Sequence, residues 1–309
     1  MIKPHLTIVQ QIDLLKSRNL KIDDWEEIYS YLSNYSYQIL INGYNDPFMK
    51  NFDRNKNEYA YNSSTRSIIS LFNYDENISL LLLKDIRKVE KKLLTTITYY
   101  ISDKLSKLNK NDGRILEIDN SDFKQIFSNK GNREEICKLM SKYLEPTDKF
   151  ILKYVDEFSE YNFYKIPIWI LSIKWTFGSL IQIFKLLNKE IQYKIIYSFN
   201  LKINIKQFIK IMGFLNIIRN KIAHGHVLYN LKFKLQDDSI QKFIFINKLD
   251  IRLINFELRL FDFIKIICKI NNDNNLLEKF KNETLNSIIN CIYITNEPKE
   301  YICNEINFK

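Results

Sequence analysis

Apolar residues recur every three to four positions along most of the chain, which is the spacing of one face of an α-helix. Near the N-terminus this pattern predicts a helix from a Thr7 N-cap through Arg18, and a second helix capped by Asp23 or Asp24 and running through Leu32. A long helix is predicted over 66–102, with a break around 73–77. Further helices are predicted over 134–143, 147–160, 167–187, 189–199, 204–223, 249–270 and 276–294.

The apolar period changes from 3.6 to 2 just after residue 230. Leu231, Phe233 and Leu235 alternate with two lysines, and Phe243 and Phe245 alternate beyond a polar turn. This pattern predicts a short β-hairpin. Only 6 Gly and 5 Pro occur in 309 residues, so few residues interrupt the helical pattern. The predicted fold is therefore mainly α, with one short hairpin.

Polar and turn-forming stretches mark the expected domain boundaries. Residues 35–48 contain an Asn-Asp-Pro turn, and 51–65 are polar. We therefore expect a small N-terminal helical domain over 1–62 and a larger helical domain over 63–309. The larger domain is expected to contain a polar insertion near 106–134 and to end in a hairpin-helix extension.

Composition narrows the class of protein. Apolar residues make up 46% of the chain and the net charge is +10, which excludes a disordered or disulfide-dense class and favours a polyanionic partner. The four cysteines form no CxxC pair, so neither a disulfide framework nor a zinc site is predicted, and a reducing cytosol fits best. The most apolar stretch, 166–187, carries Lys174 and Lys185, so we interpret it as a buried helix and expect no membrane association.

Basic residues gather at helical spacing on the predicted long helix. They are Lys84, Arg87, Lys88, Lys91 and Lys92, interrupted by Asp85 and Glu90. One interpretation is a surface that binds RNA, and the alternative is an ordinary solvated face. The hairpin lysines, Lys232 and Lys234, are a second candidate RNA-binding group.

Candidate chemistry is concentrated in the segment Arg219–Gly225, which ends the helix predicted over 204–223. Gly225 suits the position just past a helix end, so His224 is expected at the C-terminus of that helix. Asn220 is four residues before His224 and could orient the imidazole, while Arg219 supplies a planar fork for two phosphate oxygens. The alternative interpretation is that His224 only caps helix carbonyls and Arg219 pairs with a surface acid.

The segment Arg-Asn-Lys-Ile-Ala-His at 219–224 resembles the R-N-x-x-A-H motif of the HEPN superfamily, many of whose members are RNases. The passage 167–180, with Pro167, Trp169 and Thr-Phe-Gly, resembles the P-x-W…TFG-x-L passage of phage abortive-infection proteins of the AbiD/AbiF type. The opening at 3–16 and the Gly-Tyr…Pro-Phe segment at 43–48 are similar to that family as well. The family often has an Arg shortly before its Gly-Tyr, where this chain has Gln38.

The resemblance implies a HEPN-like helical bundle and a metal-independent endoribonuclease that needs no cofactor. It assigns Arg219, Asn220 and His224 to catalysis, places Lys221 near the bound RNA, and leaves the role of His226 open. Cleavage would leave a 2′,3′-cyclic phosphate and a 5′-OH. Because the chain has one copy of the motif, a homodimer with a composite site is expected.

The resemblance also implies a setting: a cytoplasmic bacterial toxin of antiphage abortive infection, regulated by a bound small noncoding RNA. Two alternatives are kept. One is a non-catalytic HEPN protein that binds RNA or a partner, and the other is a different helical regulator.

Overall fold

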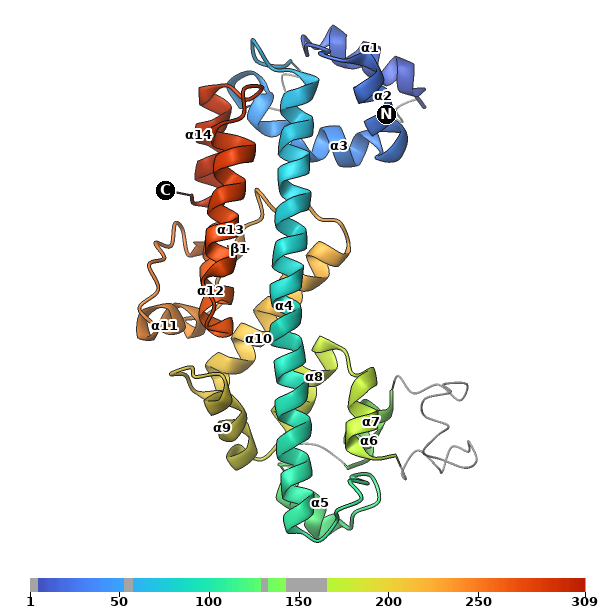
Figure 1. Ribbon diagram of the computed structural model, residues 1–309, viewed down its shortest axis with the longest axis vertical. Helices are drawn as coiled ribbons and strands as arrows, with labels where there is room; N and C mark the ends of the chain where they lie inside the picture. The colour runs from blue at the N-terminus through green and yellow to red at the C-terminus, as the bar shows by residue number, and fades with distance from the viewer. Residues whose placement is uncertain (1–4, 53–57, 129–132, 143–165, 309) are drawn as a thin grey trace. The chain divides into compact units, whose positions relative to one another are not determined.

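The computed structural model describes residues 5–52, 58–128, 133–142 and 166–308 (Figure 1). The chain divides into two compact units, each described by itself below. Unit 1 comprises Met1–Lys84, Lys221–Leu235 and Ile251–Lys309, and unit 2 comprises Asp85–Asn220 and Gln236–Asp250. The predicted division into 1–62 and 63–309 stays a prediction.

Unit 1 begins with three short helices, each started by a side-chain cap. The N-caps are Thr7, Asp24 and Ser36, whose side chains accept hydrogen bonds from backbone N–H groups of the first turn. Thr7 also forms a capping box with Gln10. Both predicted N-terminal helices are confirmed, with Thr7 and Asp24 as their N-caps. The helices are α1 Ile8–Ser17, α2 Trp25–Asn34 and α3 Tyr37–Tyr44, followed by the short turn η1 Asp46–Phe48.

The rest of unit 1 combines the start of α4, Thr65–Lys107, with the C-terminal helices. These elements are α12 Leu260–Asn271, α13 Asn275–Thr284, the π-helical turn η7 Leu285–Ile289 and α14 Asn296–Ile306. The Tyr74 hydroxyl lies 3.0 Å from the Thr284 hydroxyl, and both side chains are buried. Figure 1 shows α12 to α14 running alongside the N-terminal part of α4.

The 43-residue helix α4, Thr65–Lys107, contradicts the predicted break at 73–77. The polar residues there lie mostly on the exposed face, whereas the buried positions continue through Leu71, Asp75, Ile78 and Leu82. The stripe goes on in unit 2 at 86, 89, 93, 97, 101 and 105, all at most 1% exposed. The apolar pattern did not predict a continuous helix because one of the buried positions, residue 75, is an aspartate.

Within the described residues, unit 2 consists of the second part of α4 and seven further helices. They are α5 Asn120–Ile126, α6 Arg133–Ser141, α7 Ile168–Leu171, α8 Phe177–Leu186, α9 Lys189–Ser198, α10 Ile205–Ala223, which continues into unit 1, and α11 Ser239–Ile246. The helix predicted over 167–187 is broken, because Thr176 adopts an extended conformation and starts α8 as its N-cap. The helix predicted over 147–160 lies outside the described residues.

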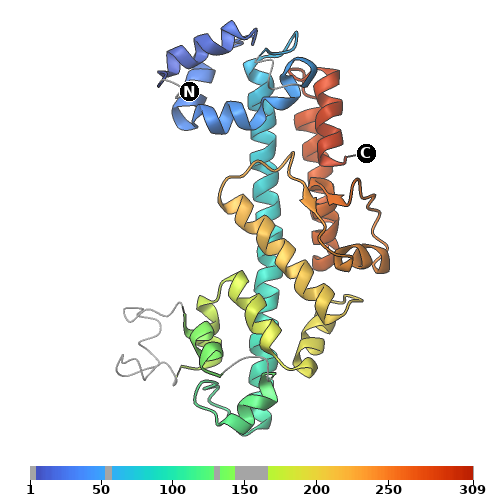
Figure 2. The same cartoon turned by 180° about the vertical axis from the view of Figure 1, so that it is seen from behind.

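The predicted strand pair exists, but its second strand was misplaced. β1 Phe233–Lys234 pairs antiparallel with β2 Glu257–Leu258, as Figure 2 shows from behind. Residues 243 and 245 instead belong to α11, because a stretch this short fits a helix as well as a strand and Ile240, Phe243 and Ile244 bury one helical face.

Two C-terminal helices also differ from prediction. The helix predicted from 249 begins only at Leu260, since Asn255 and Phe256 have positive φ angles and β2 intervenes. The helix predicted over 276–294 ends with η7 at Ile289, and α14 was not predicted. The mainly helical class with a small antiparallel sheet is confirmed. Among the described helices none combines the length and apolarity needed to span a bilayer.

Candidate functional site

Helix α10 is closed at its N-terminal end by side chains. Asn204 Oδ1 accepts a hydrogen bond from Gln207 N at 2.9 Å, and Gln207 Oε1 accepts one from Asn204 N at 2.9 Å. Phe208, Ile211 and Leu215 then bury one face of the helix. This buried face fixes the rotation of α10 and therefore the direction of the motif residues at its other end.

The C-terminal end of α10 is closed by backbone groups around Gly225. Gly225 N donates to Ile222 O at 3.0 Å, His226 N donates to Lys221 O at 3.0 Å, and Gly225 has a φ of +65°. These are the two bonds of a Schellman motif, in which the residue before the glycine is the C-cap. The predicted position of Gly225 is confirmed, and it places His224 at the last residue of the turn.

The imidazoles of His224 and His226 are both exposed. Among the described residues neither ring has a hydrogen-bond partner. Both rings are therefore open to a ligand while their backbone is held by the Schellman bonds.

Arg219 is half-buried one turn before the end of α10. Its Nη1 donates to Asn220 Oδ1 at 3.2 Å, whereas its Nε is buried and has no acceptor among the described residues. A buried N–H without an acceptor costs about 1–3 kcal/mol. The incompletely compensated guanidinium therefore favours an anion at its open side. Among the described residues Asn220 bonds to Arg219 and makes no hydrogen bond to the His224 imidazole, so the expected orientation of that ring by Asn220 is not observed.

A buried carboxylate in unit 1 holds the segment that follows His226. Asp75 Oδ2 accepts from Leu228 N at 2.9 Å and from the Tyr44 hydroxyl at 2.9 Å, and Asp75 Oδ1 accepts from Tyr229 N at 2.6 Å. The rings of Tyr44 and Tyr229 stack with centroids 5.9 Å apart. We call Tyr44, Asp75, Leu228 and Tyr229 the Asp75 cluster. It fixes the chain from the fourth residue beyond His224.

Burial controls the ionisation of Asp75. Loss of solvation raises the pKa of this carboxyl to about 7, and the three donated hydrogen bonds partly oppose the increase. Sequence reasoning missed Asp75, although an acid at helical spacing from Leu71 and Ile78 is an available signal for a buried polar anchor.

The Gly-Tyr…Pro-Phe segment also has a structural explanation. Tyr44 belongs to the Asp75 cluster, and a Cβ atom on Gly43 would lie 3.2 Å from Val227 Cγ2, closer than normal packing allows. Pro47 and Phe48 are buried in η1. The Gly-Tyr…Pro-Phe segment thus packs against the loop that follows the motif and helps to hold it in place.

The passage 167–180 contributes structure to unit 2. Pro167 starts α7, and Ile168 N donates to Gly113 O at 2.9 Å. Gly113 has a φ of +71°, and a Cβ atom there would lie 2.2 Å from the Trp169 ring. The Thr-Phe-Gly triplet starts α8 through the capping box of Thr176 with Ser179. These residues position helices, and no contact of theirs requires a ligand.

The basic residues proposed to bind RNA differ in their ion pairs, ring contacts and exposure. Lys88 Nζ pairs with Asp85 at 2.5 Å, and Lys232 Nζ pairs with Glu305 at 2.9 Å. Lys92 lies 4.7 Å from the Phe199 ring centroid, and burial lowers its pKa. Lys88 and Lys232 are nevertheless exposed. Lys84, Arg87, Lys91 and Lys234 are exposed too, and they form no ion pair among the described residues. Lys221 is half-buried in the last turn of α10.

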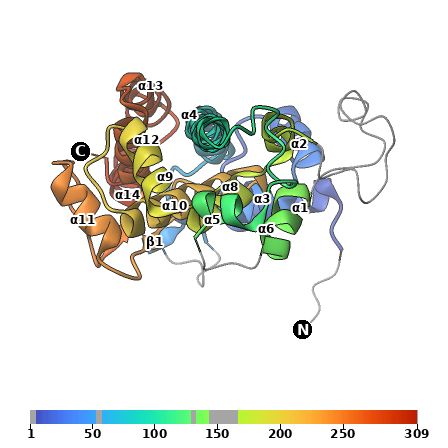
Figure 3. The same ribbon diagram turned by 90° about the horizontal axis from the view of Figure 1, so that it is seen from below.

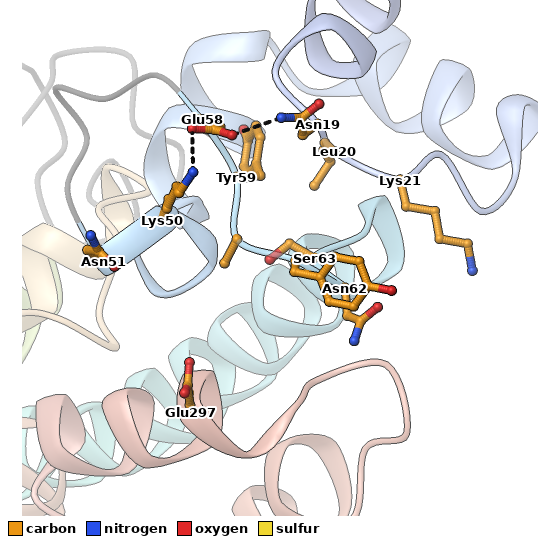
Figure 4. A pocket seen from close by; sticks show the side chains of 12 residues that line it. Asn19, Leu20, Lys21, Lys50, Asn51, Glu58, Tyr59, Asn62, Ser63 and Glu297 are labelled. Carbon is orange, nitrogen blue, oxygen red and sulfur yellow. Dashed lines mark hydrogen bonds and ion pairs between the residues drawn. The ribbon is translucent and has the colours of Figure 1, made fainter.

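A polar pocket of about 610 Å³ lies in unit 1 between the N-terminal helices and the segment 58–63 (Figure 4). Its charges are compensated from within, since Glu58 accepts from Lys50 Nζ at 3.0 Å and from Asn19 Nδ2 at 3.0 Å. Glu297 adds a second acid to the lining. The pocket therefore has little excess positive charge for an anion.

Within the described residues no three His, Cys, Asp or Glu side chains gather as a metal site would require. None of the four cysteines forms a disulfide bond.

Comparison with known proteins gives the family. A family model described as Abi-like protein matches residues 30–230, which is more than half of the chain. The match includes the Asp75 cluster, α10 and the whole segment Arg219–Gly225. No curated protein and no solved structure matches the chain. The chain therefore belongs to the family of Abi-like proteins, an abortive-infection family.

Proposed function

We propose that this Abi-like protein is an endoribonuclease toxin of the HEPN superfamily that acts in bacterial abortive infection, with Arg219, Asn220 and His224 at its active site. The observation that carries the proposal is the end of α10. There a half-buried guanidinium with an unsatisfied Nε precedes an exposed imidazole held on a Schellman turn. Together these groups can hold a phosphate and move a proton beside it.

The proposed reaction needs no group beyond the RNA and these side chains. The ribose 2′-oxygen attacks the adjacent phosphorus, the phosphorus–O5′ bond breaks, and a 2′,3′-cyclic phosphate and a 5′-OH result. A neutral imidazole accepts the 2′-OH proton, and a protonated imidazole donates one to the leaving 5′-oxygen. Arg219 stabilises the charge that builds on the phosphate oxygens, because its guanidinium stays charged and presents two donors in one plane.

Two imidazoles with opposite roles are best supplied by two chains. A homodimer related by a two-fold axis would bring two copies of the motif to one composite site. The exposure of both His224 and His226 in the single chain is compatible with such an arrangement. A bound small noncoding RNA is the proposed regulator, with the exposed cations Lys84, Arg87, Lys91 and Lys234 as its first candidate contacts.

The deciding experiment compares wild type with His224→Ala on labelled RNA in the presence of EDTA. Wild type should cleave and leave 2′,3′-cyclic phosphate ends, whereas His224→Ala should lose at least about 10²-fold in rate. His5→Ala is the matched control, because His5 is the exposed histidine remote from the motif in sequence, and it should cleave as wild type does. RNA that co-purifies with wild type should be extracted and sequenced.

The Schellman turn gives the motif a purely structural role as well, and this favours a second candidate function. In that alternative the protein binds RNA or a partner without cleaving, and His224 only ends a helix. Undiminished cleavage by His224→Ala would reject the nuclease assignment at this motif. Absence of any cleavage by RNA-free wild type would favour the binding function.

A further inference from the structure

Unit 2 contains a basic pocket. The residues of α10 that line it belong to the N-terminal part of the helix, whereas the motif is at its C-terminal end. A cavity of about 400 Å³ lies where α8 ends and where α9 and α10 begin. Lysines from all three helices line it: Lys185, Lys189, Lys206 and Lys210. Figure 3 shows α5, α8, α9 and α10 grouped in this part of the unit, and Asn188 N donates to Ile126 O at 2.9 Å, which joins α5 to the start of α9.

The pocket carries an excess of positive charge. None of its described lining residues is acidic, in contrast to the pocket of Figure 4, where Glu58 neutralises Lys50. Lys210 pairs with Asp237 at 3.0 Å, but Lys185, Lys189 and Lys206 have no carboxylate within ion-pair distance among the described residues. The first turns of α9 and α10 add their positive dipole ends to the same region. Such a pocket favours an anion.

A polar side chain without a partner lines the same pocket. The backbone of Ser128 is fixed, because its N donates to Leu186 O at 2.7 Å. Its Oγ is buried and has no hydrogen-bond partner in the described part of the chain. A buried hydroxyl normally has a hydrogen-bond partner, so this unpaired group at the pocket lining favours a ligand that supplies an acceptor.

The remaining lining is apolar. Leu187, Ile205 and Ile209 provide a surface beside the lysines, so the pocket combines a charged rim with an apolar wall. A bare inorganic anion would leave that wall unused. A nucleotide presents both a phosphate for the lysines and a flat base or ribose for the aliphatic side chains.

We infer that this pocket binds the phosphate of a nucleotide, with the nucleoside against Leu187, Ile205 and Ile209. The nucleotide has two sources of the same chemistry: a free nucleoside phosphate, or one unit of an RNA strand. The second source rests on the proposed function, whereas the first does not. In either case the site is separate in sequence from Arg219 and His224.

The test is fluorescence anisotropy with two probes, a short labelled single-stranded RNA and unlabelled uridine 5′-monophosphate as its competitor. The full chain carrying His224→Ala is used, so that RNA is not consumed. Lys189→Glu/Lys206→Glu should weaken RNA binding by at least about tenfold and reduce the salt dependence of binding by roughly two ions. The matched control is Lys279→Glu/Lys281→Glu on α13, which changes the net charge equally and should weaken binding less than roughly threefold.

Equal losses of RNA binding in the pocket variant and the control would overturn the inference. It would also be overturned if the pocket variant bound both the RNA and uridine 5′-monophosphate, the latter titrated by calorimetry, as tightly as the parent chain does. Lys189→Gln/Lys206→Gln keeps the test valid if charge reversal disturbs folding, and thermal melting reports that disturbance. Direct binding of uridine 5′-monophosphate that is lost in the pocket variant assigns the pocket to a free nucleotide, whereas a loss of RNA binding without any binding of uridine 5′-monophosphate assigns it to the strand. Cleavage measured separately with His224 intact keeps failure of this site distinct from failure of the nuclease proposal.

Discussion

The two ends of α10 differ in how they are closed and in what they present. At the N-terminal end Asn204 and Gln207 cap the helix, and flexible lysines surround an apolar wall. At the C-terminal end Gly225 closes the helix through backbone bonds, and the following loop is tied to a buried carboxylate. Long mobile cations suit binding by charge, whereas a fixed backbone suits precise placement of Arg219 and His224.

The largest expected effect of this difference is on catalysis at the C-terminal end. Arg219→Ala and Arg219→Lys should each lower the cleavage rate by about 10²–10³-fold, because a lysine cannot reproduce the planar pair of donors. Single-turnover cleavage of labelled RNA measures the loss. Arg252→Ala, which removes an exposed arginine outside the motif, should leave the rate unchanged. Wild-type cleavage by Arg219→Lys would mean that charge alone is sufficient there.

The Asp75 cluster should contribute stability that depends on pH. The raised pKa of about 7 means that the folded state holds this proton more tightly than the unfolded state. The contribution of Asp75 to the free energy of unfolding is therefore greatest below pH about 4, and it falls as the pH rises toward about 7. Asp75→Asn should remove this dependence. It should also destabilise the protein by about 1–3 kcal/mol, since the amide NH₂ would face a backbone N–H.

Thermal melting at several pH values checks both expectations for Asp75→Asn. Asp13→Asn, an exposed change on α1, is the control and should shift neither stability nor its pH dependence by much. A wild-type protein that gains stability as the pH rises from 5 to 7, with Asp75→Asn showing the same slope, would contradict the assignment.

Replacement by alanine should change stability in opposite directions at two glycines, Gly213 inside α10 and Gly225 just past its C-terminal end. Gly225→Ala places a Cβ in the left-handed region and should cost about 1 kcal/mol. Gly213→Ala should stabilise by roughly 0.5–1 kcal/mol, because Gly213 is inside α10 and a Cβ there meets nothing within 4 Å. Chemical denaturation of both variants measures the difference. Equal and same-signed effects would mean that the Schellman turn does not determine the C-terminal end.

The smallest expected effect on the cleavage rate comes from the cap at the N-terminal end of α10. Asn204→Ala should lower stability by about 1 kcal/mol, because Gln207 N loses its acceptor. The loss should leave the cleavage rate within roughly twofold of wild type, since the cap is fifteen or more residues before Arg219. A large loss of cleavage in Asn204→Ala would show that the two ends are coupled along the helix.

Local signals predicted the helix ends well. Thr7, Asp24, Pro167 and Gly225 all act at the positions that their chemistry favours, because capping depends on residues within one turn. Local signals failed at 243–245, where a short apolar alternation is equally compatible with a strand and a helix. They also failed at 73–77, where several polar residues in a row predicted a break although the helix continues through them.

The candidate sites also differ in whether their residues lie close together along the chain. The motif at 219–224 is contiguous in the chain, so its residues could be named from the sequence. The lysine pocket draws its residues from three helices and from Ser128, and no single stretch of sequence marks it. The Asp75 cluster joins residues up to 185 positions apart, Tyr44 and Tyr229, through hydrogen bonds that only folding creates.

The sequence by itself determined the helical class, the caps, the glycine-closed end of α10 and the residues that could act on a phosphate, because each depends on groups close along the chain. Tertiary structure decided which polar residues lose their water. Asp75 has a raised pKa because folding buries it, and packing also buries Arg219 Nε, which has no acceptor in the described part of the chain. Likewise, Lys185, Lys189 and Lys206 form a site only where three helix ends meet.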